Sequence, residues 1–172
     1  FHVVSFDEII AYSRSGYGST CGSSSATTNA PPVVAAGPDH TIPARTPFAL
    51  GGSGSDPDGN SLVYSWQQVD VGRVPISGTA TLAEALTDWG SGPLYRVLPF
   101  AADGAARAFP SLADVLAGST RLGEVYPTTT RTLTFRLFAR DDEAWGGGAG
   151  YDTVQVDVLD TGQKDPVNFL AP

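Results

Sequence analysis

Residues 52–66 read GSGSDPDGNSLVYSW, an acidic turn rich in glycine and proline that runs directly into an alternating strand. Pro57 presets one φ angle of a tight turn, and Gly59 permits the positive φ angle that such turns often require. Because side chains alternate along a strand, three large apolar side chains then share one face: Leu62, Tyr64 and Trp66. The stretch predicts a corner of a β-sandwich.

The composition of the 172 residues indicates one domain with a hydrophobic core, because 41% of them are hydrophobic. The 20 glycines and 13 prolines favour many short strands joined by tight turns. A formal net charge of −8 disfavours binding to nucleic acid, whose phosphates attract clustered Lys and Arg. No apolar run approaches the roughly 20 residues that cross a bilayer. Neither a nucleic-acid partner nor a membrane span is therefore expected.

Six short strands are expected, each bounded by turn residues. They cover residues 33–36, 48–50, 62–69, 94–98, 132–139 and 153–159. The last two show the clearest alternation of apolar and polar residues, which is typical of strands with one buried face. They predict a terminal hairpin, with residues 146–148 (GGG) at its tip.

The fold class expected from these strands is all-β: an Ig-like or PKD-like antiparallel β-sandwich. Between the third and fifth strands lies a long inserted excursion with one short helix at 111–116, where Ser111 and Asp114 form a cap after Pro110. The chain divides into four parts: a detached hydrophobic segment at 1–12, a flexible Ser/Gly/Thr/Pro linker at 13–32, the sandwich at 33–160 and a C-terminal tail at 161–172.

Several motifs resemble the PKD and related Ig-like modules of bacterial extracellular proteins. They are residues 33–39 (VVAAGPD) with 41–43 (TIP), residues 56–60 (DPDGN) with 64–66 (YSW), and residues 152–154 (DTV). Four further motifs resemble the module that follows the catalytic domain in secreted reprolysin-like zinc metallopeptidases: 92–96 (GPLYR), 109–112 (FPSL), 123–127 (GEVYP) and 131–136 (RTLTFR). The resemblance spans most of residues 3–160.

This resemblance implies a secreted, extracellular protein of bacterial origin, in which residues 1–21 correspond to the end of a peptidase domain. The catalytic helix of that family carries His-Glu-x-x-His, which places two imidazoles on one zinc ion. This chain contains only His2 and His40, and neither lies in such a motif. The adjacent Asp141 and Asp142 do not oppose one another as the two carboxyl groups of a glycosidase do. We therefore expect no enzymatic activity and no required cofactor.

The acidic loops predict a calcium site. One loop carries Asp56, Asp58 and Asn60, and another carries Asp141 and Asp142. In a sandwich these two loops emerge at the same end, and Ca²⁺ takes six to eight oxygen ligands from flexible turns of this kind. In the alternative interpretation, the first loop's side chains only hydrogen-bond the backbone of their own turn.

The N-terminal segment predicts a structural role, because its apolar side chains need a surface that buries them: Val3, Val4, Phe6, Ile9 and Ile10. Residues 5–8 (SFDE) resemble a capping box and favour a helix, whereas residues 2–6 (HVVSF) also fit a strand. A strand of this kind adds to the open sheet of a neighbouring copy and joins subunits head to tail into a filament. The first hypothesis is a non-catalytic extracellular structural or interaction module whose partners are other copies of itself.

The second hypothesis is an accessory module of a secreted bacterial zinc metallopeptidase that binds a substrate or a cell surface, with a missing N-terminal peptidase domain as its partner. Its expected surface contacts are aromatic: Trp89, Tyr95 and Trp145. Trp66 is instead expected in the core. Cys21 is expected to be exposed, and the Thr-rich stretches 19–28 and 128–130 predict O-glycosylation outside the cell.

Overall fold

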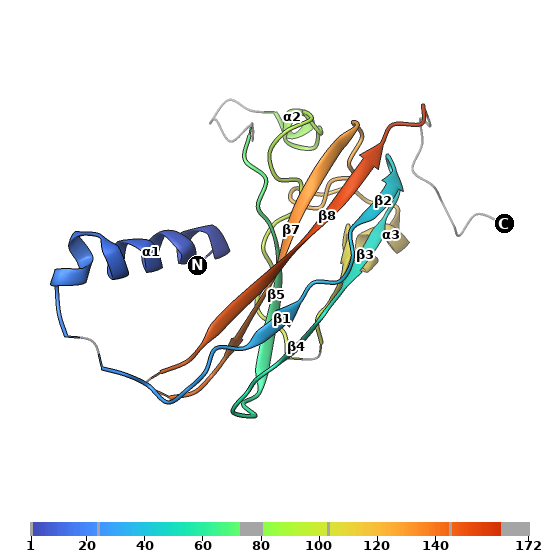
Figure 1. The fold of residues 1–172 in the computed structure, drawn as a ribbon. Coiled ribbons are helices and arrows are strands. Elements are labelled where there is room, and N and C mark those ends of the chain that lie inside the picture. The colour runs from blue at the N-terminus through green and yellow to red at the C-terminus, as the bar shows by residue number, and fades with distance from the viewer. Residues whose placement is uncertain (1, 24, 73–80, 103, 145, 163–172) are drawn as a thin grey trace.

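The computed structural model describes residues 2–23, 25–72, 81–102, 104–144 and 146–162 (Figure 1). Its helices are α1 (Val3–Ser15), the 3-10 helix η1 (Tyr17–Thr20), α2 (Leu82–Ala85) and α3 (Leu112–Ala117). Its strands are β1 (Val33–Ala35), β2 (His40–Pro43), β3 (Phe48–Gly51), β4 (Ser53–Ser55), β5 (Leu62–Gln68), β6 (Ala106–Phe109), β7 (Arg131–Asp141) and β8 (Ala149–Leu159). The chain is a mixed structure with a long N-terminal helix, so the all-β expectation is wrong.

The centre of the fold is a four-stranded sheet in the order β2-β8-β7-β5. β7 and β8 form the expected antiparallel hairpin, and β5 pairs antiparallel with β7, with Trp66 opposite Leu137. At the other edge β2 runs parallel to β8, with His40 opposite Val156, so the expectation of purely antiparallel pairing is wrong there. Parallel neighbours need a long connection, and nearly the whole body lies between β2 and β8 in the chain.

Two smaller sheets, β1-β4 and β3-β6, complete the set. In the second of them Phe48 of β3 lies opposite Phe109 of β6, so a strand from the long excursion pairs with a strand that precedes it in the chain. Within the described residues the three sheets are not joined by hydrogen-bonded pairing, and no closed sandwich is shown.

Aromatic rings fill the core between the four-stranded sheet and the β3-β6 pair. The ring of Phe109 lies 4.8 Å from that of Phe135 on β7 and 5.2 Å from that of Phe48, measured between centroids. Trp66 is buried in the same core, as expected. The alternation along β7 and β8 supplies the remaining apolar side chains: Leu133, Leu137, Val154, Val156 and Val158. Burial of each such side chain stabilises the fold by about 1.5–3 kcal/mol.

Two local predictions are confirmed. Ser111 caps α3, because its hydroxyl accepts a hydrogen bond from the backbone N–H of Asp114. Gly59 has the positive φ angle, 82°, that the turn at 56–60 needs.

Other local predictions are wrong. Residues 94–98 are not a strand, and Tyr95 forms only an isolated bridge to Glu124. Three short strands were not expected: β2, β4 and β6. Each is only three or four residues long, which is too short for a periodic pattern to show.

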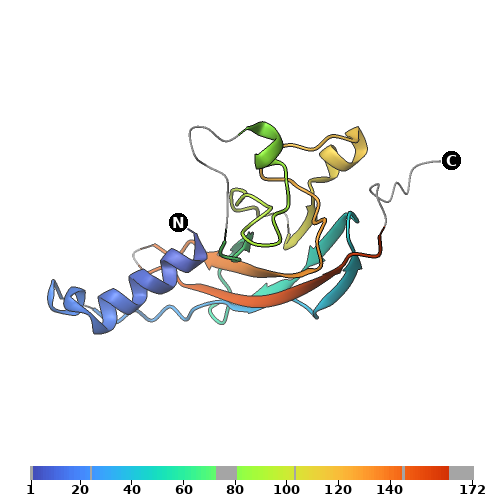
Figure 2. The same cartoon turned by 90° about the horizontal axis from the view of Figure 1, so that it is seen from above.

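The N-terminal segment is a helix and not a strand. α1 begins at Val3 with His2 as its N-cap, and not at the capping box expected within residues 5–8. The helix lies against the face of the sheet that points away from the aromatic core, because Phe138 and Arg136 alternate with the core residues along β7 and contact α1. From there it projects beyond the end of the sheet (Figure 1, Figure 2).

No helix within the described part of the chain is both long enough and apolar enough to cross a membrane.

Candidate functional site

The two acidic loops meet at one end of the body, as the sequence predicts, and Asn29 joins them. Its side-chain N–H groups donate hydrogen bonds of 3.0 Å to Oδ2 of Asp141 and 3.0 Å to the carbonyl oxygen of Gly146. Its side-chain oxygen accepts a 3.1 Å hydrogen bond from Nδ2 of Asn60. Asn29 belongs to the segment expected to be a flexible linker, so the last part of that segment is instead attached to the body.

The carboxylates of these loops mostly bind backbone N–H groups. Oδ1 of Asp56 accepts hydrogen bonds from the N–H groups of Asp58 and Asn60. These contacts are the ones expected in the alternative interpretation, in which the side chains of the loop hydrogen-bond the backbone of their own turn. Oδ2 of Asp58 accepts a 2.6 Å hydrogen bond from Ala30.

Asp141 also stabilises its own loop. Burial alone would raise its pKa, but hydrogen bonds from Asn29, Gly148 and Glu143 outweigh that effect and lower the pKa. Asp142, the last of the predicted calcium ligands, is exposed. In the described part of the chain, no three His, Cys, Asp or Glu side chains are grouped so that they would hold a metal ion. The calcium site stays a prediction from the sequence.

An open, polar cavity of about 780 Å³ lies beside the junction at Asn29. The residues that line it include 25–29, Asp58, Asn60 and Glu143. Its lining is rich in hydroxyl, amide and carboxylate groups, which suits polar ligands rather than apolar ones.

The first turn of α1 is anchored in the sheet by polar contacts. Val3 is fully buried, and its backbone N–H donates a 2.6 Å hydrogen bond to Oε1 of Gln67 on β5. Nδ1 of His2 accepts from the N–H of Val4, while its Nε2 lies 3.2 Å from the carbonyl oxygen of Gln68. The anchor satisfies two of the N–H groups that a helix start leaves unpaired.

The second turn of α1 contacts β7 and β8. The ring of Phe6 lies 5.3 Å from that of Phe138. Oδ2 of Asp7 accepts a 2.7 Å hydrogen bond from Nη1 of Arg136 and a 3.3 Å hydrogen bond from the hydroxyl of Tyr151. Burial, followed by that hydrogen bond to Asp7, raises the pKa of Tyr151. The expectation of a segment detached from the body is therefore wrong for the first two turns.

The five residues predicted to drive assembly are divided between two faces of α1. Val3 and Phe6 face the sheet, and Ile10 is half-buried. Val4 and Ile9 point outward, together with Tyr12, with exposed fractions of 37%, 49% and 59%. α1 therefore has a docked face and a mostly apolar outward face, made of Val4, Glu8, Ile9 and Tyr12.

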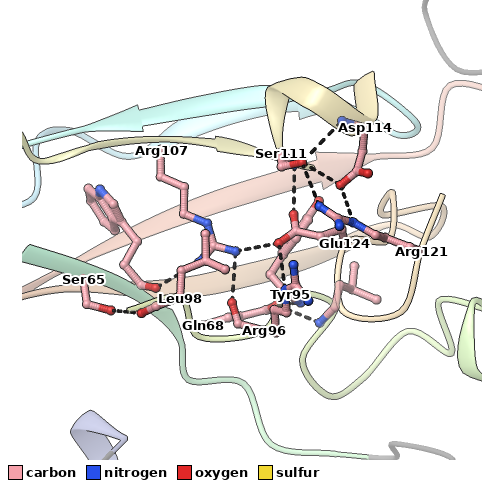
Figure 3. Close-up of polar contacts among 12 residues, drawn as sticks. Ser65, Gln68, Tyr95, Arg96, Leu98, Arg107, Ser111, Asp114, Arg121 and Glu124 are labelled. Carbon is pink, nitrogen blue, oxygen red and sulfur yellow. Dashed lines mark hydrogen bonds and ion pairs between the residues drawn. The ribbon is translucent and has the colours of Figure 1, made fainter. Parts of the chain in front are cut away.

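A buried ionic network holds the long excursion against the sheet (Figure 3). Glu124 is fully buried, and its Oε1 accepts a 2.9 Å hydrogen bond from Nη2 of Arg107 on β6. Its Oε2 accepts from the backbone N–H of Ser111, the residue that caps α3. Nη1 of Arg107 also donates to the carbonyl oxygen of Trp66 on β5. One carboxylate thus connects α3, β6 and, through Arg107, β5.

Tyr95 is part of this interior and not a surface contact, so that prediction is wrong. Only 4% of its surface is exposed, and its N–H donates to Oε1 of Gln68. Burial, together with the nearby charge of Glu124, raises the pKa of Tyr95 well above its ordinary value. Trp89 is 41% exposed, and its Nε1 donates to the carbonyl oxygen of Glu84. Trp145 lies outside the described residues.

Asp88 anchors the end of the excursion to the start of β7. Its Oδ2 accepts from the N–H groups of Thr128 and Thr129, and its Oδ1 accepts a 2.8 Å hydrogen bond from Arg131. Burial opposes ionisation of Asp88, but hydrogen bonds from Gly90, Thr128, Thr129 and Arg131 outweigh it and lower its pKa.

Sequence reasoning did not single out Glu124, Arg107, Asp88 or Asn29. Charged and polar residues in segments rich in glycine and proline normally indicate solvated loops. Their positions depend on contacts between residues 11 to 112 positions apart. No local pattern signals such contacts.

No family model matches the chain, and no match is found among the curated proteins. Among solved structures, the chain is similar to the crystal structure of DIP-gamma IG1+IG2, with a TM-score of 0.31 and 10% sequence identity. The alignment covers 74% of this chain and 48% of that chain, so this chain spans about half the length of the protein it matches.

Proposed function

We propose that the chain is a non-catalytic extracellular interaction module that assembles head to tail with other copies of itself through α1. The observation that carries this proposal is that α1 is anchored to the sheet at its N-terminal end and free along the rest of its length. The PKD-like or Ig-like identity, the bacterial origin and the secreted location belong to the same proposal, and they rest on the sequence resemblance.

The geometry of α1 favours an intermolecular role. Its docked side is limited to the first two turns, where Val3, Phe6 and Asp7 contact the sheet. The later turns project from the body as an arm (Figure 1) and carry the exposed Tyr12, while Ile9 is exposed on the outward face of the second turn. A helix with one buried stripe normally turns polar side chains outward. Large apolar side chains on the free face are typical of a surface that binds a partner.

The mode of assembly differs from the strand addition expected from the sequence. Residues 3–15 form a helix, in which most backbone N–H and C=O groups pair within the segment, and a helical segment cannot extend a sheet. The proposed contact is therefore packing of a helix against a neighbouring copy, by the helix-in-groove type of recognition.

The accessory-module hypothesis has less support from the geometry. Of its three aromatic contacts, Tyr95 is buried and Trp145 is not described, which leaves Trp89. One exposed indole is a weak basis for a binding surface, because single apolar residues are common on protein surfaces.

The experiment that tests assembly compares the unaltered chain with the variant Ile9→Asp/Tyr12→Asp. The mass in solution is measured by light scattering coupled to size-exclusion chromatography, over a wide range of protein concentration. We expect the unaltered chain to gain mass with concentration and the variant to remain a monomer. The substitutions lie on the exposed face, so the melting temperature should change little.

A matched control carries the same two charges elsewhere. Val71→Asp/Leu82→Asp alters two exposed apolar side chains outside α1 and should assemble like the unaltered chain. An unaltered chain that stays monomeric at every concentration would contradict the proposal.

A further inference from the structure

The face of the sheet beneath α1 fits that helix through specific contacts. Gln67 on β5 is 1% exposed, and its Oε1 accepts the N–H of Val3. Phe138 on β7 is 6% exposed, and its ring packs against that of Phe6. Without α1, the ring of Phe138 loses this apolar cover and Oε1 of Gln67 loses this donor. The sheet surface that contacts α1 is called the cradle below: Gln67, Arg136, Phe138 and Tyr151.

An ion pair makes the cradle selective for an acidic helix. Nη1 of Arg136 donates a 2.7 Å hydrogen bond to Oδ2 of Asp7, and the guanidinium group lies 4.3 Å above the ring of Tyr151. The stacking restricts the direction of the guanidinium group, and a charge-assisted hydrogen bond depends on that direction. A helix with the sequence of α1 meets the apolar, backbone and ionic contacts together, and every copy of the chain carries one.

The tether between α1 and the body, residues 16–28, is long and exposed. Figure 1 shows α1 projecting from the body and the chain returning from the far end of the helix. Residues 19–23 and 25–28 are exposed, and hydroxyl groups within the tether donate to carbonyl groups of the same segment. Asn29 then attaches the chain to the two acidic loops. The cradle therefore holds α1 at one end, and the tether connects the other end to the body.

The length of the tether allows α1 to reach a second copy. The tether spans at most about 45 Å when fully extended, whereas α1, with 13 residues, is about 20 Å long. The contacts that release of α1 breaks belong to its first two turns, and docking on the cradle of another copy restores the same contacts. Exchange of an identical element between copies therefore has a low cost in free energy.

We propose that the cradle is also a docking surface for α1 of a second copy, so that α1 exchanges between copies. Val3, Phe6 and Asp7 of one copy then make with the next cradle the contacts that they make with their own. Reciprocal exchange closes a dimer, and one-way exchange extends an open chain. This inference goes beyond the proposed function, because it uses the docked face of α1 and not the outward face.

Charge reversal on each side of the ion pair tests the exchange in the full chain. Asp7→Arg places a cation against Arg136, and Arg136→Asp places an anion against Asp7. We expect the docking of α1 on its own cradle to weaken about tenfold in each variant, because like charges then meet at hydrogen-bond distance. Amide hydrogen exchange in residues 3–15 should accelerate accordingly. The double variant Asp7→Arg/Arg136→Asp pairs opposite charges again and should behave like the unaltered chain.

Mixing the two single variants in equal amounts should restore docking, but between copies. The reversed helix of one variant then meets the reversed cradle of the other, and the unaltered helix and cradle also meet. Since each copy regains a contact weakened about tenfold, we expect the mixture to dimerise about a hundredfold more tightly than the unaltered chain. Light scattering should show twice the monomer mass for the mixture and a single monomer mass for each variant alone. Protection of residues 3–15 from hydrogen exchange should return in the mixture.

The outcomes separate this inference from the proposed function. A mixture that stays monomeric, with fast hydrogen exchange in residues 3–15, would overturn the exchange of α1. If the unaltered chain nevertheless gains mass and Ile9→Asp/Tyr12→Asp does not, assembly through the outward face stands alone. If the mixture dimerises while the unaltered chain is monomeric at every concentration, the proposed function fails and the cradle stands as a docking surface. Dimerisation of the double variant as tight as that of the mixture would also overturn the exchange.

A second pair of variants covers the case in which Arg136→Asp destabilises the sheet. Asp7→Lys and Arg136→Glu reverse the same charges, and Arg136→Glu retains more of the apolar stem beside the ring of Tyr151. Melting temperatures of the separate variants establish that both are folded. We expect the same dimer in the mixture of these two variants. Monomers in a mixture of the two folded variants would overturn the assignment of the cradle.

Discussion

Nη2 of Arg107 donates a 2.9 Å hydrogen bond to Oε1 of the fully buried Glu124, and this pair joins the long excursion to the central sheet. The guanidinium group also lies 4.5 Å above the ring of Phe109 in the aromatic core. The ion pair therefore links the cap of α3, where the N–H of Ser111 donates to Glu124, to the aromatic core. The excursion is thus attached by specific polar contacts as well as by apolar packing.

Removal of one member of this pair should strongly destabilise the fold. Glu124→Ala leaves the buried charge of Arg107 and the N–H of Ser111 without their acceptor. We expect a loss of about 3–5 kcal/mol in the free energy of unfolding, measured by denaturant titration.

The matched variants separate charge from packing. Glu124→Gln keeps an acceptor for the N–H of Ser111 and should cost less than Glu124→Ala. The double variant Glu124→Leu/Arg107→Leu removes both charges and should recover part of the stability, because paired buried charges are replaced by apolar groups. An unchanged free energy for Glu124→Ala would contradict the structural role.

The anchor at Asp88 should make stability depend on pH. Its folded-state pKa lies below the value of about 3.9 in an unfolded chain. The ionised carboxylate therefore contributes its full stabilisation above about pH 4, and the contribution is lost as the pH falls through the folded-state pKa. The variant Asp88→Asn should lose about 3 kcal/mol at pH 7, because Arg131 is left without its charged partner.

The measurement is the difference in the free energy of unfolding between the unaltered chain and Asp88→Asn, from pH 7 to pH 2. The difference should be largest at neutral pH and should shrink below pH 4. Other carboxylates titrate in the same range, but they act on both proteins alike and cancel in the difference. A difference that is constant with pH would refute this role.

The docking of α1 should depend on Val3. Val3→Asp places a charge at a fully buried position, which costs more than one apolar contact. We expect amide hydrogen exchange in residues 3–15 to accelerate more than tenfold, with the body of the protein protected as before. The control Val4→Asp alters the neighbouring, outward side chain and should leave exchange in α1 nearly unchanged. Equal effects of the two variants would show that α1 is not docked as described.

The calcium prediction from the loop aspartates has a direct test. Ligand that binds only the folded state raises its stability by mass action. The prediction is that millimolar Ca²⁺ raises the melting temperature relative to EDTA, and that Asp58→Asn/Asp142→Asn abolishes the rise. Both side chains are exposed, so the variant should remain folded. Identical melting temperatures in Ca²⁺ and EDTA would refute the prediction.

Elements that carry their own pattern could be predicted from the sequence. The alternation in β7 and β8 identified both strands and the hairpin between them, because a half-buried strand must alternate. Ser111 and Asp114 located the start of α3, because a cap is a contact between neighbours in the chain. Side chains two apart share one face of a strand, and the apolar face of Tyr64 and Trp66 therefore placed Trp66 in the core.

Predictions failed where the environment came from distant parts of the chain. Tyr95 has no local feature that separates a buried tyrosine from an exposed one, and its burial comes from packing against Phe48, Phe109 and Phe135. The strand Ala106–Phe109 exists because Phe48 and its neighbours pair with it. The assembly residues were expected on a detached segment, but the sheet supplied a surface for one side of their helix.

Local periodicity, turn chemistry and capping were therefore determined within the sequence, since each depends on residues a few positions apart. Tertiary structure alone determined which charges are buried, which side of α1 is docked, and that Asn29 joins the two acidic loops. Those properties follow from contacts between residues such as Asp7 and Arg136, 129 positions apart. Their free energy appears only when the whole chain has folded and brought such residues together.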